Sequence, residues 1–182
     1  MTVRVALVIG SLRRGSFTRA VALAVQELAA DRLELIPVEI GDLPLYNPDL
    51  EDDLPVAWTR FRTAVSETRA VLFATPEYNR SIPGALKNAL DVGSRPYGQS
   101  VWQGKPAAIV SVSPGAIGAF GANHHLRQPL VFLDMPVMQQ PEAYVGGVAD
   151  LLDAEGRLVN EGTRAFLKTF ADRFADWIEK TA

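Results

Sequence analysis

Serine, threonine and arginine side chains gather directly after the first apolar segment of the chain. That segment ends at Ile9 and is followed by Gly10-Ser11-Leu12-Arg13-Arg14-Gly15-Ser16-Phe17-Thr18 and then by an alanine-rich helical pattern. Hydroxyls at Ser11, Ser16 and Thr18 can each donate a hydrogen bond to a phosphate oxygen. A helix that begins here adds unpaired N–H groups and the positive end of its dipole. The pattern predicts a phosphate-binding loop.

The arginines and glycines of this loop indicate which kind of phosphate it suits. Arg13 or Arg14 can add a charged, forked donor, and Ser16 is predicted to cap the helix. The loop lacks the Lys-Ser/Thr ending of nucleoside triphosphate loops and the three glycines of dinucleotide sites, so a small phosphate monoester fits better. The alternative is an ordinary strand-to-helix connection whose serines cap the helix and whose arginines face solvent.

The elements that must position this loop alternate along the chain. Short runs rich in valine, isoleucine and leucine are predicted as buried parallel strands: Val3–Ile9, Leu33–Val38, Ala70–Ala74 and Ala107–Val112, with a fifth near Pro136–Met138. Helical patterns occupy the segments between and after them: Phe17–Ala30, Pro55–Thr68, Pro83–Asp91, a segment within Ala122–Leu133, and Glu161–Lys180. Pro55 and Pro83 are expected in the first turns of their helices.

This alternation predicts an α/β fold with an open, doubly wound, five-stranded sheet in the order 2-1-3-4-5. Ligands of such sheets bind beyond the carboxyl ends of the strands, where the strand order reverses. Three loops should therefore meet between the first and third strands: Gly10–Thr18, Thr75–Pro83 and Ser113–Gly121. The linker-like stretch Ser94–Lys105 is expected to cross the surface near the same place.

Composition limits the function classes. The 182 residues fit one domain over residues 1–182. Cysteine is absent, so redox chemistry needs a cofactor. A net charge of −3, with 14 arginines and 4 lysines in no long basic run, argues against nucleic-acid binding. We expect neither a signal peptide nor a membrane span, and a cytoplasmic location.

The second loop carries the most specific pattern of the chain. It reads Thr75-Pro76-Glu77-Tyr78-Asn79-Arg80-Ser81-Ile82-Pro83. Two further motifs accompany it, Gly10-Ser11-Leu12-Arg13 and Ser113-Pro114-Gly115-Ala116-Ile117-Gly118 followed by His125-Leu126-Arg127-Gln128. Together they resemble the NADPH-dependent FMN reductase family, in particular its chromate and quinone reductase branch. The resemblance extends over nearly the whole chain.

The resemblance implies a flavodoxin-like, three-layer fold and an enzyme that oxidises NADPH or NADH with FMN as cofactor. Hydride would pass from the nicotinamide through FMN to quinones or similar planar acceptors, with chromate, azo and nitro compounds as further candidates. Because the cofactor carries this chemistry, no catalytic acid or base and no metal ligand is assigned. The family resemblance also implies a homodimer or homotetramer.

The parts of FMN match the three loops. Its single terminal phosphate suits the first loop, and its ring needs backbone donors and acceptors from the other two. Glycines at positions 115 and 118 would let the backbone approach a flat ring. The predicted FMN-binding residues are therefore Ser11, Arg13, Ser16, Phe17, Thr18, Pro76, Glu77, Tyr78, Asn79, Ser113, Pro114, Gly115 and Gly118.

Several polar residues have competing interpretations. For Glu77 we favour a structural role over one in orienting an arginine near the flavin, and Tyr78 either lines the ring or anchors its loop. Adjacent histidines on a helix point in different directions. We therefore expect His124 and His125 on the helix surface or a subunit interface rather than at a metal, and Arg127 in a salt bridge or an interface.

Assembly is predicted from the apolar residues of two helices. Leu86, Leu90, Leu126 and Leu130 exceed what one sheet face is expected to cover, so at least a homodimer is predicted. Chromate-reducing relatives often carry an arginine and a tyrosine just before His-Leu-Arg-Gln, where this chain has Gly121-Ala122-Asn123-His124. This departure bears on substrate preference and on the subunit interface, and not on FMN binding.

Two other functions stay open from sequence. One is a flavodoxin-like electron carrier, a class that tends to be strongly acidic, which a net charge of −3 supports only weakly. The other is a reductase that releases reduced FMN to a partner monooxygenase.

Overall fold

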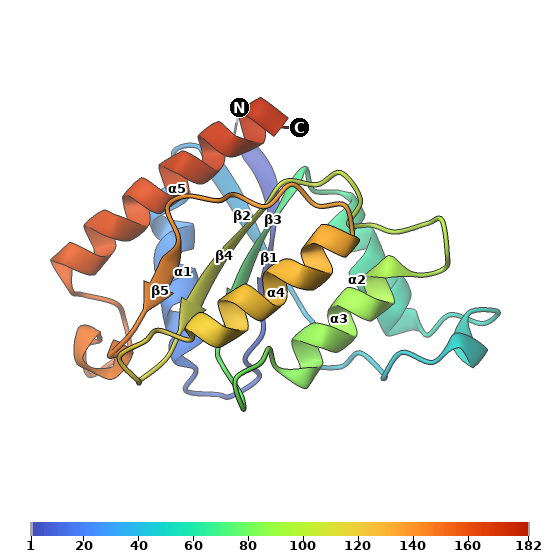
Figure 1. The fold of residues 1–182 in the computed structure, drawn as a ribbon, viewed down its shortest axis with the longest axis horizontal. Coiled ribbons are helices and arrows are strands. Elements are labelled where there is room, and N and C mark those ends of the chain that lie inside the picture. The colour runs from blue at the N-terminus through green and yellow to red at the C-terminus, as the bar shows by residue number, and fades with distance from the viewer. Residues whose placement is uncertain (1, 182) are drawn as a thin grey trace.

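The computed structural model describes residues 2–181, which contain one five-stranded sheet. Its strands are β1 (Val3–Ile9), β2 (Leu33–Val38), β3 (Ala70–Thr75), β4 (Ala107–Val112) and β5 (Ala143–Val145). All neighbouring strands pair in parallel, in the order β2-β1-β3-β4-β5 (Figure 1). The predicted α/β fold and strand order are confirmed.

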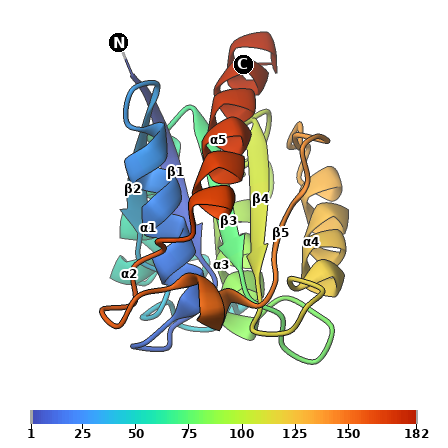
Figure 2. The ribbon, with the colours of Figure 1, turned by 90° about the vertical axis from the view of Figure 1, so that its left-hand side faces the viewer.

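Helices cover both faces of this sheet. They are α1 (Phe17–Ala29), α2 (Val56–Ser66), α3 (Gly84–Ser94), α4 (Phe120–Phe132) and α5 (Glu161–Thr181), with short 3-10 turns η1 (Pro48–Leu50) and η2 (Val148–Leu151). α1 and α5 pack on one face, and α2, α3 and α4 pack on the other (Figures 1 and 2). No helix in the described part of the chain is long and apolar enough to cross a membrane.

The two-sided covering explains the unbroken apolar strands. Along β1, Leu7 and Ile9 belong to the core shared with α1 and α5, whereas Ala6 and Val8 belong to the core shared with α2, α3 and α4. Successive side chains of a strand point to opposite faces, so a strand covered on both sides is apolar at every position.

The fifth strand lies later in the chain than predicted. The segment near Pro136–Met138 forms only an isolated bridge between Val137 and Ala107, while Ala143–Val145 makes the ladder with the carboxyl end of β4. Proline has no N–H to donate to a ladder, which limits pairing around Pro136. The prediction of a strand at Pro136–Met138 was therefore wrong by several residues.

The two prolines at helix starts are caps rather than first-turn residues. Pro55 and Pro83 have extended backbones with ψ of 138° and 147°. Each still accepts an early helical hydrogen bond, from Thr59 N at 3.1 Å and from Lys87 N at 3.0 Å. The helices therefore begin one residue later than expected, at Val56 and Gly84.

The stretch Ser94–Lys105 does not lie near the predicted site. It precedes β4 and therefore lies at the amino edge of the parallel sheet, opposite the loop after β1. Its Trp102 is fully buried, with ring centroids 5.8 Å from those of Phe61 and Phe73, and donates a 3.0 Å hydrogen bond to Leu90 O. A residue of this apparent linker is thus part of the core.

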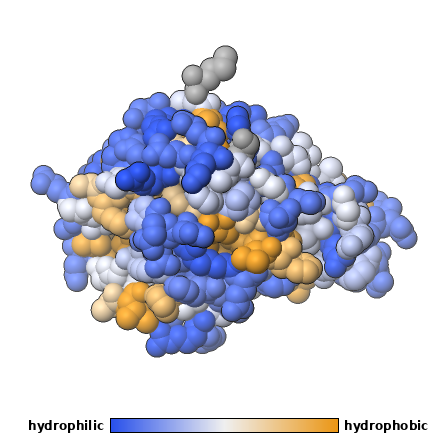
Figure 3. All heavy atoms as spheres, turned by 45° about the horizontal axis from the view of Figure 1, so that its top comes forward, coloured by the Kyte–Doolittle hydropathy of each residue, from blue (hydrophilic) through white to orange (hydrophobic). Residues whose placement is uncertain are grey.

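The leucines that suggested an interface are part of the core. Leu86, Leu90, Leu126 and Leu130 are at most 1% exposed, so the reasoning from them was wrong. The sheet face covers all four because α3 and α4 pack side by side with α2 against it. Exposed apolar side chains lie elsewhere, and Figure 3 shows separate apolar patches on a largely hydrophilic face.

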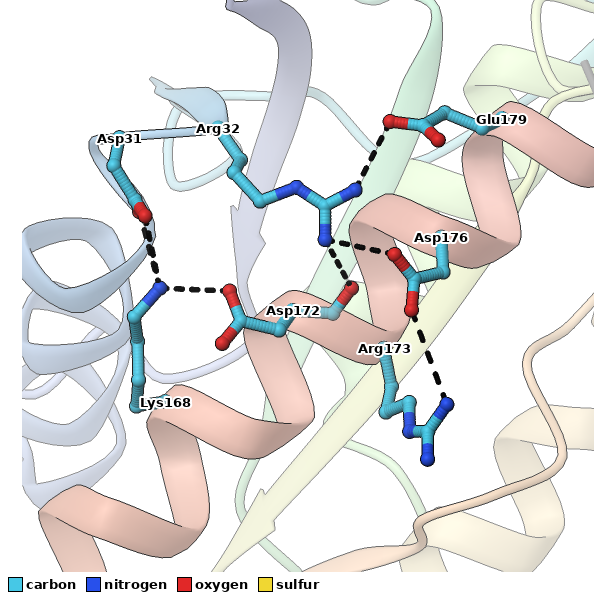
Figure 4. Close-up of polar contacts among 7 residues, drawn as sticks. All are labelled: Asp31, Arg32, Lys168, Asp172, Arg173, Asp176 and Glu179. Carbon is cyan, nitrogen blue, oxygen red and sulfur yellow. Dashed lines mark hydrogen bonds and ion pairs between the residues drawn. The ribbon is translucent and has the colours of Figure 1, made fainter.

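Charged side chains hold α5 against the turn between α1 and β2 (Figure 4). Arg32 donates to the carboxylates of Asp176 at 2.7 Å and Glu179 at 2.9 Å. Lys168 bridges Asp31 at 3.1 Å and Asp172 at 2.7 Å, and its hydrogen bond lowers the pKa of Asp31. Except for Lys168–Asp172, which lies within α5, these pairs join segments more than a hundred residues apart in the sequence.

Candidate functional site

A pocket of about 290 Å³ lies at the carboxyl edge of the sheet, where β1 and β3 end side by side. Residues from all three predicted loops line it: Ser11, Arg13, Phe17, Thr18, Pro76, Glu77, Tyr78, Val112, Ser113 and Pro114. Four predicted site residues are outside this lining: Ser16, Asn79, Gly115 and Gly118. Sequence reasoning missed Val112, although its place at the end of β4 next to Ser113 could have indicated it.

The hydroxyl groups at one end of the pocket are available for a ligand. Ser11 and Thr18 are 5% and 2% exposed, and neither hydroxyl bonds to another residue in the described range 2–181. Ser16 has a different task, because its Oγ accepts a 3.1 Å hydrogen bond from Arg19 N, which confirms it as the cap of α1. The N–H groups of Phe17 and Thr18 open the helix and have no acceptor within it.

The structure distinguishes the two arginines of the loop. Arg13 lines the pocket, lies with its guanidinium carbon 4.8 Å from the centre of the Phe17 ring, and donates to Gly15 O. Arg14 instead lines a neighbouring groove with Arg19. Arg13 is therefore the arginine that can reach an anion in the pocket.

Glu77 has structural contacts. Its side chain is only 12% exposed. Oε2 accepts a 3.0 Å hydrogen bond from Ala122 N in the first turn of α4, and Oε1 pairs with Arg80 at 3.1 Å. A carboxylate is stabilised by the positive end of a helix dipole. Both contacts reduce the negative charge that Glu77 presents to the pocket.

The residues after Glu77 form a tight turn at the rim. Tyr78 and Ser81 exchange backbone hydrogen bonds of 3.0 and 3.1 Å, and Tyr78 is half exposed. Between them, Asn79 and Arg80 have φ angles of 52° and 65°. A turn with two positive φ angles matches the mirror-image hairpin type. Asn79 lies at its exposed tip, away from the pocket lining.

The glycines of the third loop serve the packing of the protein itself. Gly118 has φ of 58°, and a β-carbon there would lie 2.7 Å from the backbone carbon of Tyr144. Gly115 donates its N–H to Ser113 Oγ at 2.9 Å. Contact with β5 therefore already requires a glycine at position 118, independently of any ligand.

The neighbouring histidines contact different partners, as expected from their directions on α4. His124 Nε2 lies 3.0 Å from the Tyr144 hydroxyl, and His125 Nδ1 lies 2.7 Å from Ser81 Oγ. Burial, assisted by Glu142, raises the pKa of Tyr144 to about 12, so this phenol stays neutral at physiological pH. Residues 2–181 contain no cluster of three or more metal-binding side chains.

Arg127 has a structural role. It donates to Asn123 Oδ1 at 3.3 Å and to Met138 O at 3.2 Å, and lies 3.9 Å from a carboxylate oxygen of Glu142. It ties α4 to the segment before β5 and confirms the expected salt bridge.

The donor set fits the parts of FMN. Free hydroxyls, a guanidinium and the open N–H groups of a helix start suit a terminal phosphate. Two prolines and the half-exposed Tyr78 give the other end of the pocket flat, partly apolar walls that suit a ring. No unpaired carboxylate among the lining residues opposes an anion, because Glu77 is engaged by α4 and Arg80.

Comparisons with known proteins agree with this geometry. A sequence model described as NADPH-dependent FMN reductase matches residues 3–150. The chain is 64% identical over 176 residues to a quinone reductase of Pseudomonas putida, covering 96% of this chain and 94% of that protein. It is 47% identical over 178 residues to a 2-hydroxy-1,4-benzoquinone reductase of Burkholderia sp., with coverage of 98% and 97%. The structure of FerB, a flavoenzyme NAD(P)H:(acceptor) oxidoreductase from Paracoccus denitrificans, superposes with a TM-score of 0.93 at 45% identity over 99% of each chain.

Proposed function

Because the chain belongs to the NADPH-dependent FMN reductase family, we propose that it is an FMN-dependent NAD(P)H oxidoreductase that reduces quinones. One observation carries the proposal: free hydroxyls of Ser11 and Thr18 lie with Arg13 at the start of α1, inside a pocket at the carboxyl edge of the sheet. We further propose that residues 1–182 form a single FMN-binding domain.

We assign the phosphate to Ser11, Arg13 and Thr18, with Ser16 holding the helix start in place. Phe17 supports the guanidinium of Arg13. The ring would contact the side chains of Pro76, Glu77, Tyr78, Ser113 and Pro114, which line the pocket. We also retain Asn79, Gly115 and Gly118, which belong to the same two loops, as residues whose backbone would lie near the ring.

FMN, when bound, supplies the capacity to take up hydride from the nicotinamide and pass it to the acceptor. The chain's own contribution is to bind and orient. The loop after β1 fixes the phosphate, the turn at Tyr78 and the loop at Pro114 bound the ring, and the open rim admits first the nicotinamide and then the quinone. No side chain of the pocket is assigned to proton transfer.

An anaerobic spectroscopic experiment tests this function. Purified protein is given NADPH and then benzoquinone while the visible absorbance of its flavin is followed. We expect the absorbance to be bleached by NADPH and restored by benzoquinone, over repeated cycles. Bleaching by dithionite but not by NADPH would favour an electron carrier instead. Flavin recovered in the filtrate after reduction would favour release of reduced FMN to a partner.

Assembly and location extend the proposal. We propose that the protein works in the cytoplasm, where NAD(P)H is available, and that it forms a homodimer or a homotetramer. Support for assembly comes from the end of α4, where Val131 and Phe132 are 73% and 89% exposed, and from the 88% exposed Tyr97, which lines a groove together with Phe132. Large apolar side chains that are grouped and exposed usually mark an interface.

Light scattering at micromolar concentration should give at least twice the 19.8 kDa of one chain. Replacing Phe132 by glutamate should lower the measured mass, because burying a carboxylate in an apolar interface is costly. The exposed Val159 offers a matched control, since glutamate there should leave the mass unchanged. A mass of one chain for the unaltered protein would contradict the proposed assembly.

A further inference from the structure

The turn that bounds the pocket has an unusual backbone conformation. Tyr78 and Ser81 share two backbone hydrogen bonds, and the residues between them, Asn79 and Arg80, both have positive φ without being glycine. Such conformations are unfavourable for residues with a β-carbon and persist where the surrounding structure imposes them. Contacts from outside the turn must therefore fix its position.

Helix α4 supplies these contacts along one of its faces. Its Ala122 N–H binds Glu77 Oε2 at 3.0 Å. Gly121 allows the close approach, because a β-carbon there would lie 2.9 Å from Glu77 Oε2 and 3.3 Å from Arg80 O. One helical turn further, His125 Nδ1 lies 2.7 Å from Ser81 Oγ. Residues three and four positions apart lie on the same side of a helix.

We propose that His125 is a positioning residue of the quinone site. Through Ser81 it holds the turn against α4, and thereby fixes the side chains of Glu77 and Tyr78 at the pocket wall. His125 itself is not among the residues that line the pocket, so it acts only through this turn. The inference rests on the proposed function, because it assumes that the quinone enters the pocket past Tyr78.

Either tautomer of the imidazole can make this hydrogen bond. Neutral Nδ1 accepts from the Ser81 hydroxyl, and protonated Nδ1 donates to the same oxygen, since a hydroxyl can play both roles. The positioning role therefore requires the atom at Nδ1 and does not require a charge. Asparagine can place an amide atom near this point, whereas alanine cannot.

Steady-state kinetics and amide exchange together test the role. One hydrogen bond of this kind corresponds to about three- to tenfold in an equilibrium constant. We expect His125→Ala and Ser81→Ala each to raise the KM for benzoquinone by about three- to tenfold, with kcat and the Kd for FMN within about twofold of the unaltered protein.

The second readout needs no enzymatic activity. Hydrogen exchange of the Tyr78 and Ser81 amides should speed up by a similar factor in His125→Ala, because these N–H groups pair only within the turn. The double variant with Ser81→Ala should resemble either single variant, since both remove the same bond. His125→Asn should keep both the KM for benzoquinone and the amide exchange rates close to those of the unaltered protein. His124→Ala is the matched control on the same helix and should change neither readout.

The outcomes separate this inference from the proposed function. If the unaltered protein does not reduce benzoquinone with NADPH, the proposed function fails and the exchange rates alone decide the role of His125. If the protein is active but His125→Ala leaves KM unchanged, or if exchange of the two amides stays at its original rate, the positioning role is wrong. Additive effects in the double variant would also overturn it.

Discussion

Replacing Arg13 by alanine is expected to weaken FMN binding by about ten- to a hundredfold, with little change in turnover per bound FMN. Arg13 lines the pocket, and we propose that its guanidinium binds the FMN phosphate. A hydrogen bond to a charged group contributes about 1.5–3 kcal/mol, which corresponds to this range in Kd. The phosphate stays bound throughout the reaction, so its contacts stabilise the ground and transition states equally. Fluorescence titration of the apoprotein with FMN measures the effect.

Arg14→Ala is the matched control for that experiment. Arg14 is the next residue in the same exposed loop, but it lines a separate groove. Its removal should change the Kd for FMN by less than about threefold, the effect of a surface charge partly screened by salt. Equal losses in both variants would mean that the loop acts through its overall charge. An unchanged Kd in Arg13→Ala would mean that the hydroxyls and the N–H groups at the helix start bind the phosphate without Arg13.

Replacing Gly93 by alanine is expected to destabilise the fold by about 1–2 kcal/mol. A β-carbon there would lie 2.4 Å from Nε1 and 2.5 Å from Cε2 of the buried Trp102 ring. Overpacking of this kind costs about 1–3 kcal/mol or more, and the higher helix propensity of alanine offsets about 1 kcal/mol. Thermal unfolding should show a Tm lowered by roughly 2–8 °C for a domain of this size.

The same helix provides the control for that substitution. Gly84 begins α3, and no atom lies within 4 Å of the position of its added β-carbon. Gly84→Ala should therefore leave stability unchanged or raise it by about 0.5–1 kcal/mol, through the lower entropy of the unfolded chain. A Tm for Gly93→Ala equal to that for Gly84→Ala would contradict the packing argument.

The sheet could be predicted from sequence because strands that are buried on both faces appear as unbroken runs of apolar residues. β1, β2 and β4 begin and end where their apolar runs do. The position of β5 could not be predicted, because this strand has only three residues. So short a run cannot be distinguished by its pattern from the apolar segment before it. Trp102 shows the same limit, because a loop rich in glycine and polar residues gives no sign that one aromatic ring enters the core.

The lining of the pocket could largely be predicted from side chains, whereas the reasons for its glycines could not. Ser11, Arg13 and Thr18 lie together because the strand order brings the carboxyl ends of β1 and β3 side by side. Gly118 was predicted to approach the ligand, and the structure adds a second requirement for glycine there, the close contact with Tyr144 in β5. Sequence shows that a position lacks a side chain. It does not show which neighbour requires the space.

The docking of α5 has a consequence for the order in which the molecule can assemble during synthesis. Arg32 and Lys168 join the α1–β2 turn to this last helix, and Leu167, Phe170 and Phe174 complete the core beneath it. A nascent chain whose α5 is still inside the ribosome has already released all five strands, but only α1 covers that face of the sheet. The enzyme therefore completes this core only after α5 has emerged, and until then the part of the sheet face that α5 covers is exposed to chaperones and to aggregation.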